Sequence, residues 1–205
     1  GEPIGRLLVY GATEHKAVPQ ALLHWNAVLG LDLEVVALPV CGHGQHQLDV
    51  LAQWLGDTAL LCTMAANNET GVVSDLGGIE RLIHTHNPAV LWLVDCVQAL
   101  GKLPLKLRQT RMDYATFSGH KLYGPKGIGL LYVRAGSPYT AMMAAGVHEA
   151  GLRAGTENMP GIAAWGAATK ALREGSTFHS GRGTMAHRGH LARALFLASP
   201  GLWFR

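Results

Sequence analysis

The chain has 205 residues, of which 48% are hydrophobic and 15% are charged. This balance excludes intrinsic disorder, which requires low hydrophobicity and high net charge. The net charge of +3 is too small to indicate a nucleic-acid-binding protein. We expect no transmembrane helix and no secretory signal, because the sequence lacks the long apolar run and the basic opening segment that these require. The 3 cysteines lack CxxC spacing, which favours free thiols and a reducing, cytoplasmic location.

Strands and helices are predicted to alternate along the chain. In chain order we expect a strand over Arg6–Tyr10, a helix over Lys16–Leu29, a strand over Asp32–Val40, a helix over Leu48–Leu55, strands over Thr58–Ala65 and Ala89–Asp95 with a helix over Asp75–His86 between them, strands over Asp113–Phe117 and Ile128–Arg134, and helices over Glu157–Leu172 and Thr184–Leu197. Glu174–Gly183 reads as a linker. The alternation predicts an α/β fold with a mostly parallel sheet flanked by helices.

Polar residues follow four of the predicted strands. They are residues 11–15, residues 67–71, Asp95 with Gln98, and residues 118–121. Ligands of open α/β sheets bind at the carboxyl ends of strands, so these residues are the candidates for a site. Together they offer Lys, Asp, Gln, Ser, Asn and His side chains, which can hold an anionic, aromatic, aldehyde-bearing cofactor. Pyridoxal phosphate fits that description.

Each of these residues also has a simpler interpretation. Lys121 could contact a phosphate, act as a nucleophile, or be an ordinary lysine on an exposed loop. Asp95 could pair with a cation or cap a helix. His15 could be a polar residue at a helix start, and the Asn67-Asn68 pair could form a turn. Only their recurrence at strand ends favours a functional site.

Two other classes of function are weakly indicated. Cys41, His43 and His46 have metal-ligand chemistry but form an incomplete zinc set, so we expect a polar surface turn and no metal. Basic residues over 179–190 could bind nucleic acid, but aromatic residues are not interleaved with them and a solvated helix face is favoured.

Five segments resemble the cysteine desulfurases in their order and spacing, and the resemblance runs over nearly the whole chain, from about Arg6 to Arg205. They are TEHKAV, NNETG, VDCVQALGKLPL, SGHKLYGPKGIG and RAGTEN. The resemblance implies the class V aminotransferase-like group of fold type I enzymes, with the large domain of the aspartate-aminotransferase-like fold. It also implies pyridoxal 5'-phosphate as cofactor and release of sulfur from L-cysteine, giving L-alanine and a protein-bound persulfide. Selenocysteine lyases and other class V enzymes share much of the pattern and remain alternatives.

The resemblance assigns roles to five residues around the cofactor ring. Lys121 would bind the cofactor covalently and move protons at the substrate α-carbon, and His15 would stack on the ring and assist. Asp95 would hold the pyridine nitrogen protonated, and Gln98 would hydrogen-bond the phenolic oxygen. Asn68 would line the cofactor or substrate pocket.

The cofactor phosphate is assigned to three further residues. Ser118 and His120 would bind it in the same chain, and Thr156 would reach the phosphate of a partner subunit. The last role implies a homodimer with shared sites. A sulfur acceptor or iron-sulfur scaffold protein is an expected partner, whereas nucleic acid and membrane are not.

Some segments of the cysteine desulfurases have no counterpart in the sequence. The phosphate loop before the histidine motif, the persulfide-forming cysteine and the arginine that binds the substrate carboxylate are not recognised. We therefore expect a central portion of such an enzyme, with a partial large domain over 1–175 and a linker and helix toward a small domain over 176–205. We expect little turnover from this chain alone, and a non-catalytic fragment remains an alternative.

Overall fold

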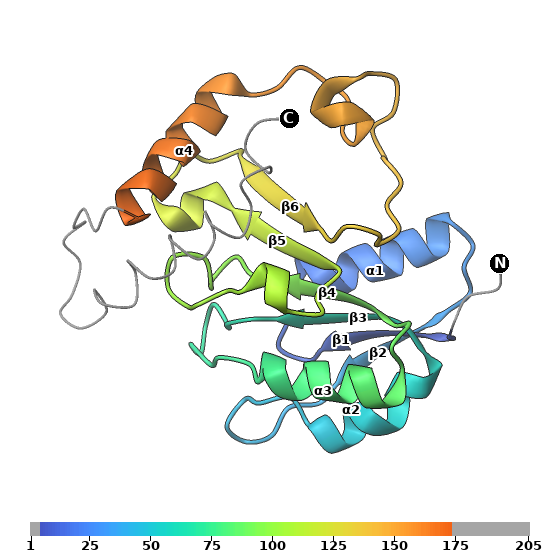
Figure 1. Cartoon of the computed structure of the whole chain (residues 1–205). Coiled ribbons are helices and arrows are strands. Elements are labelled where there is room, and N and C mark those ends of the chain that lie inside the picture. The colour runs from blue at the N-terminus through green and yellow to red at the C-terminus, as the bar shows by residue number, and fades with distance from the viewer. Residues whose placement is uncertain (1–4, 174–205) are drawn as a thin grey trace. The chain divides into compact units, whose positions relative to one another are not determined.

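A computed structural model describes residues 5–173. Its strands and helices, drawn in Figure 1, are β1 (Leu7–Gly11), α1 (Ala17–Val28), β2 (Glu34–Leu38), α2 (Leu48–Trp54), β3 (Thr58–Met64), α3 (Leu76–His86), β4 (Leu91–Asp95), β5 (Tyr114–Ser118), β6 (Gly129–Val133) and α4 (Met159–Arg173). Short 3-10 helices cover Leu55–Asp57, Leu107–Gln109, Gly119–Leu122 and His148–Gly151. The predicted strands and helices over this part of the chain are confirmed within a few residues. The predicted linker and the predicted helix over Thr184–Leu197 lie outside the described residues.

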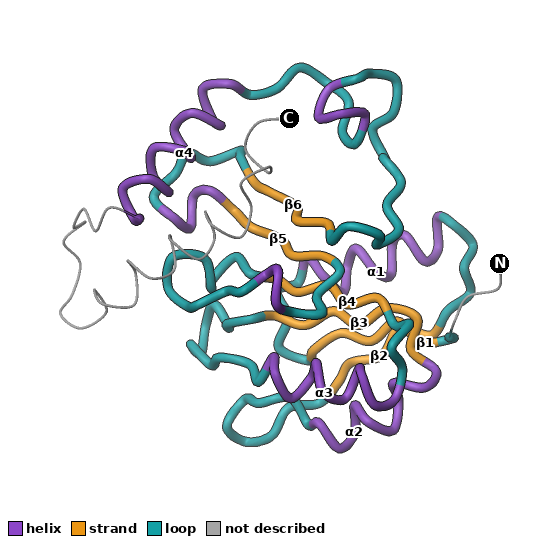
Figure 2. The backbone as a smooth tube through the Cα atoms, in the orientation of Figure 1, coloured by secondary structure: helices purple, strands orange, loops and turns teal. Residues whose placement is uncertain are grey.

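The strands form one sheet in the order β2-β1-β3-β4-β5-β6. All pairings from β2 through β5 are parallel, which confirms the predicted α/β class. Because parallel strands are joined by right-handed crossovers, α1 covers one face of these strands and α2 and α3 cover the other (Figure 2). The strand order reverses at β1, so the crevice beyond the carboxyl ends of β1 and β3 is the expected place for a ligand.

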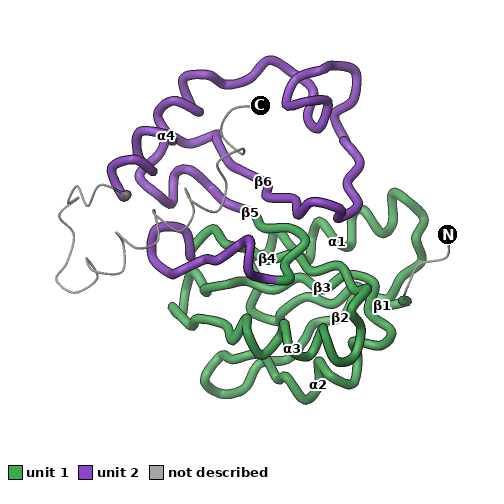
Figure 3. The backbone as a smooth tube through the Cα atoms, viewed as in Figure 1, with its two compact units in different colours: residues 1–98, 111–116 green, residues 99–110, 117–205 purple. Residues whose placement is uncertain are grey.

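The chain divides into two compact units (Figure 3). Unit 1 contains residues 1–98 and 111–116, and unit 2 contains residues 99–110 and 117–205. β5 contributes its first three residues to unit 1 and its last two to unit 2. The predicted domain boundary at 175/176 lies outside the described residues and stays a prediction.

The core of unit 1 is apolar but contains a few paired polar groups. Trp92 on β4 is fully buried, and its indole Nε1 donates to Thr63 Oγ1 on β3 at 2.9 Å. Its backbone amide donates to Asp113 Oδ2 at 2.8 Å, and Arg111 Nη1 lies 2.6 Å from the same oxygen. Buried polar groups are tolerated when they are hydrogen-bonded in this way.

Two general features bear on function. None of the helices over residues 5–173 combines the length and the apolar character needed to cross a membrane. The thiols of Cys41, Cys62 and Cys96 are free; Cys41 is exposed, whereas the other two are buried.

Candidate active site

The turns that follow β1 and β3 are joined by a side chain. Asn67 Nδ2 donates to the backbone oxygen of Thr13 at 2.9 Å. The backbone amide of Ala65 donates to the backbone oxygen of Asp95 at 2.9 Å, which joins the ends of β3 and β4. The residues that follow these three strands therefore meet at one edge of the sheet in unit 1, as the sequence predicts.

Asn67 lies among the candidate residues 67–71, but no role at the cofactor was predicted for it. Its Oδ1 accepts from the backbone amides of Glu69 at 2.9 Å and Thr70 at 2.8 Å, so its side chain shapes the turn that presents Asn68. Asn68 itself is exposed. The available signal was that asparagine side chains commonly bond backbone groups two residues ahead.

His15 lies between this turn and α1, and its side chain is exposed. Its Nδ1 accepts from the backbone amide of Ala17, the first residue of α1, at 3.3 Å. This contact agrees with a role at the helix start. It leaves the ring face and Nε2 available for a second role.

Asp95 ends β4 in a partly buried position. Burial raises the pKa of its carboxyl above the usual range, while the backbone amide of Val97 and the nearby His15 act in the opposite direction. Its Oδ1 accepts from the Val97 amide at 2.9 Å. The helix-cap alternative is wrong, because the residues after β4 form turns up to Leu107–Gln109. Gln98 lies half-buried in the first of these turns.

Glu14 is the second carboxylate of this region, and the sequence reasoning did not assign it a role. Burial raises its pKa to about 8, and the charge of Asp95 adds to the effect, whereas the backbone amide of Met64 opposes it. A carboxylate beside His15 at the end of a buried strand was the signal that could have found it. A neutral carboxylic acid can donate a hydrogen bond near neutral pH.

The remaining predicted residues lie in unit 2, and two of them touch. Ser118 Oγ and His120 Nδ1 are 2.8 Å apart, at the end of β5 and in the following 3-10 turn. Lys121 is the next residue of this turn and is exposed. Ser118 and His120 therefore form one hydrogen-bonded pair directly before the lysine.

Close backbone approach explains the glycines around Lys121. A Cβ on Gly124 would lie 2.8 Å from the backbone oxygen of Gly119, which accepts from the Gly124 amide at 2.9 Å. Tyr123 between them adopts a left-handed conformation with φ 59°. Leu122 is buried beneath this turn, whereas its neighbour Lys121 is exposed.

Thr156 is exposed in the segment before α4. The amide of Gly155 donates to His148 Nδ1 at 3.3 Å, and Asn158 Oδ1 accepts from the Gly161 amide at 3.0 Å at the start of the helix. These contacts order the backbone on both sides of Thr156.

The metal-binding alternative gains no support. Within the described ranges, no three His, Cys, Asp or Glu side chains gather as ligands for a metal ion. Cys41 and His43 are exposed, whereas His46 is buried.

Comparison with known proteins gives the family. The model of the aminotransferase class-V family matches residues 4–195. The chain is 41% identical over 173 residues to a cysteine desulfurase of Trichormus azollae, covering 82% of this chain and 41% of that relative. It is 42% identical over 172 residues to the cysteine desulfurase IscS of Anaeromyxobacter sp. strain Fw109-5, with the same two coverages of 82% and 41%. The chain thus spans less than half the length of these relatives.

Solved structures agree with these matches. A NifS-like protein superposes with a TM-score of 0.74 at 37% identity, over 83% of this chain and 47% of that one. SspA in complex with cysteine superposes with a TM-score of 0.70 at 30% identity, over 80% of this chain and 47% of that one. The parallel sheet and the sequence matches lead to the same conclusion: the chain belongs to the aminotransferase class-V family, whose cysteine desulfurases depend on pyridoxal phosphate.

Proposed function

We propose that this protein is a pyridoxal-phosphate-dependent cysteine desulfurase that converts L-cysteine to L-alanine and transfers the sulfur to a thiol. The observation that carries the proposal is the position of Asp95, a partly buried carboxyl at the end of a central parallel strand, beside His15. The similarity to cysteine desulfurases supports the substrate, as does the likeness to SspA in complex with cysteine.

The residues of unit 1 fit the ring of the cofactor. Burial disfavours the ionised form of Asp95, so a cationic pyridinium N–H would favour that form and offset the cost. Gln98 follows in the same turn and would hydrogen-bond the phenolic oxygen. His15 would stack on the ring with its exposed face, and Asn68 would line the substrate side.

The residues of unit 2 fit the aldehyde and the phosphate. Ser118 and His120, 2.8 Å apart, would donate hydrogen bonds to the phosphate, and Lys121 would bind the cofactor through its Nζ. Thr156 would reach the phosphate of a partner subunit in a homodimer. Exposed apolar side chains in the segment that precedes Thr156 support a homodimer, since Met142 is 71% and Val147 87% exposed.

Each step of the proposed reaction is then assigned to a residue of this chain. When bound, the pyridinium ring supplies an electron sink. Lys121 takes and returns the proton at the substrate α-carbon, and His15 assists in proton transfer. Asp95 keeps the ring nitrogen protonated. The overall reaction is balanced without an added oxidant: L-cysteine and a thiol give L-alanine and a persulfide.

The acceptor thiol is proposed to be none of the three cysteines of this sequence, Cys41, Cys62 and Cys96. Burial raises the pKa of both Cys62 and Cys96 far above the usual range, which makes them poor nucleophiles. Cys41 is exposed and backbone hydrogen bonds at His43 and Gln45 lower the pKa of its thiol, but it lies in the loop after β2, which none of the desulfurase-like segments includes. As part of the proposal, the persulfide serves a sulfur acceptor or iron-sulfur scaffold protein in the cytoplasm, where free thiols persist.

Product stoichiometry tests the reaction. The protein is incubated with pyridoxal phosphate, L-cysteine and dithiothreitol, and alanine and sulfide are measured together. The proposal predicts equal amounts of both products, and loss of both in Lys121→Ala, even if the turnover is slow. Pyruvate and ammonia in place of alanine, or alanine formation that survives Lys121→Ala, would contradict it.

A further inference from the structure

Two buried side chains of unit 1 lack hydrogen-bond partners among residues 5–173. Both carboxyl oxygens of Glu14 and both ring nitrogens of His46 are enclosed without a partner at hydrogen-bond distance, although the backbone amide of Met64 lies near enough to Glu14 to lower its pKa. Glu14 lies in the turn after β1, and His46 lies in the segment between β2 and α2. A buried polar group without a partner is costly, so each calls for an explanation.

Gly11 shows that the two groups face the same small space. A Cβ built on Gly11 would lie 2.4 Å from His46 Nε2 and 3.0 Å from Glu14 Oε1. Gly11 has no positive φ, so space rather than backbone conformation requires glycine here. Both polar atoms thus approach one point above the end of β1.

We propose that Glu14 and His46 form a buried hydrogen-bonded pair across Gly11 that fixes the turn carrying His15. The chemistry is complementary, because a carboxyl and an imidazole can each donate or accept. One hydrogen bond between them gives a partner to the Glu14 carboxyl and to one ring nitrogen of His46. The pair ties the β1–α1 turn to the β2–α2 loop, next to the hydrogen bond that the Ala12 amide donates to the backbone oxygen of Leu38 on β2 at 2.8 Å.

The charged and titratable groups around the pair determine its protonation. Burial and the charge of Asp95 at the end of β4 raise the pKa of Glu14, and the Met64 amide on β3 opposes them. Burial, and after it the Glu14 charge, raises the pKa of Cys62 on β3. Burial lowers the pKa of His46. The ring is therefore neutral near pH 7, while Glu14 is protonated below about pH 8.

The direction of the hydrogen bond follows from that protonation. Below about pH 8, the Glu14 hydroxyl donates to the Nε2 lone pair of His46, and the ring proton is on Nδ1. Above it, the Glu14 carboxylate accepts from Nε2–H. The ring changes tautomer without changing charge, which an isolated buried histidine does not do.

The consequence for catalysis rests on the proposed function. Glu14 precedes His15, so the pair makes Glu14 and His46 positioning residues for a ring that stacks on the cofactor. The pairing itself does not depend on the cofactor, and it is tested on the protein without it.

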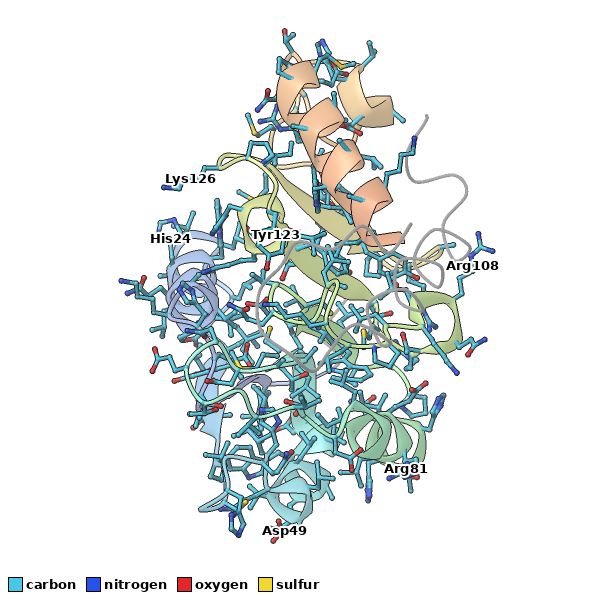
Figure 4. The ribbon with its side chains drawn as sticks, turned by 90° about the vertical axis from the view of Figure 1, so that its left-hand side faces the viewer. His24, Asp49, Arg81, Arg108, Tyr123 and Lys126 are labelled. Carbon is cyan, nitrogen blue, oxygen red and sulfur yellow. The ribbon has the colours of Figure 1, made fainter. Side chains whose placement is uncertain are left out.

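The direct test is nitrogen NMR of the protein labelled with ¹⁵N-histidine, without cofactor. We expect the two His46 ring nitrogens to swap their chemical shifts around pH 8. The nitrogen with the shift of a protonated site takes that of an unprotonated site and the reverse, while the ring stays neutral. His24, exposed on α1 and labelled in Figure 4, serves as a control histidine outside the proposed pair. Glu14→Gln should abolish the exchange, because an amide donates and accepts at every pH. A single His46 tautomer throughout, or an unchanged exchange in Glu14→Gln, would overturn the proposal.

A double-mutant cycle tests the same contact without NMR. Glu14→Leu and His46→Leu each leave one buried group unpaired, whereas the double variant leaves none. We expect the decrease in the urea midpoint of unfolding to be smaller in the double variant than the sum of the decreases in the two single variants. Losses that add up within error would overturn the pairing. Gly11→Ala, whose methyl group would occupy the shared space, should abolish the tautomer exchange as Glu14→Gln does.

Discussion

The two units present their candidate residues in different ways. In unit 1, Asp95 and Glu14 lie at the ends of buried parallel strands, and burial raises the pKa of both carboxyls. In unit 2, Lys121 and His120 are exposed on a glycine-rich turn whose shape comes from close backbone contacts. The chemistry of unit 1 is thus set by desolvation, and that of unit 2 by backbone geometry.

This difference predicts which substitutions each unit tolerates. Unit 1 should be sensitive to changes that add or remove a buried charge. Unit 2 should be sensitive to changes that add volume at its glycines, such as Gly119 and Gly124, and insensitive to charge changes at exposed positions. The following predictions are ordered by the size of the expected effect.

The largest effect is expected at a buried ion pair of unit 1. Arg111→Met leaves the Asp113 carboxylate, whose side chain is 6% exposed, without its 2.6 Å partner. We expect a loss of about 3–5 kcal/mol in the free energy of unfolding, measured by urea denaturation. Arg6→Met breaks an exposed pair with Asp57 and should cost under about 1 kcal/mol. Equal losses in the two variants would contradict the role given to burial.

The next effect concerns the pH dependence of stability. The folded-state pKa of Glu14 is raised to about 8 from 4.5, so between these values the folded state holds a proton that the unfolded state has released. The contribution of Glu14 to the free energy of unfolding is therefore fully present below about pH 4.5. It falls as the pH rises toward 8, by up to about 1.4 kcal/mol per pH unit. Urea unfolding of Glu14→Gln from pH 5 to 8 should show a flatter profile than the wild type.

Glu69→Gln is the matched control, since it makes the same change at an exposed carboxylate. It should follow the wild-type pH profile. A wild-type slope that persists in Glu14→Gln would mean that another group carries the proton.

The Lys121 turn gives a smaller expected effect. Gly124→Ala places a methyl group 2.8 Å from the backbone oxygen of Gly119, and overpacking of this kind costs about 1–3 kcal/mol. Thermal unfolding measures the loss. Gly166→Ala in α4, where nothing lies within 4 Å, should instead stabilise the protein by about 0.5–1 kcal/mol. A neutral Gly124→Ala would refute the account of this turn.

The sequence predicted the sheet well because its signals are local. Apolar runs such as Thr58–Ala65 mark strands buried on both faces, and the alternation with helices implies parallel pairing. The meeting of the turns after β1, β3 and β4 followed from the general rule for such sheets.

The details of the site were harder to predict. His46 reads in sequence as part of a metal-like Cys-His-His set, and nothing local indicates that it faces Glu14, which is 32 positions away. The space above Gly11 exists only once β1 and the loop after β2 are packed together. The left-handed Tyr123 is likewise imposed by the closure of a turn and not by residue preference.

The most direct test of the central claim is to map where the cofactor attaches. The protein is mixed with pyridoxal phosphate and reduced with borohydride, and the adduct is located by peptide mass spectrometry. The account predicts one adduct on Lys121, lost in Lys121→Ala and kept in Lys126→Ala, whose lysine is exposed five residues further on (Figure 4). No adduct, or adducts spread over surface lysines, would contradict the claim that this turn holds the cofactor.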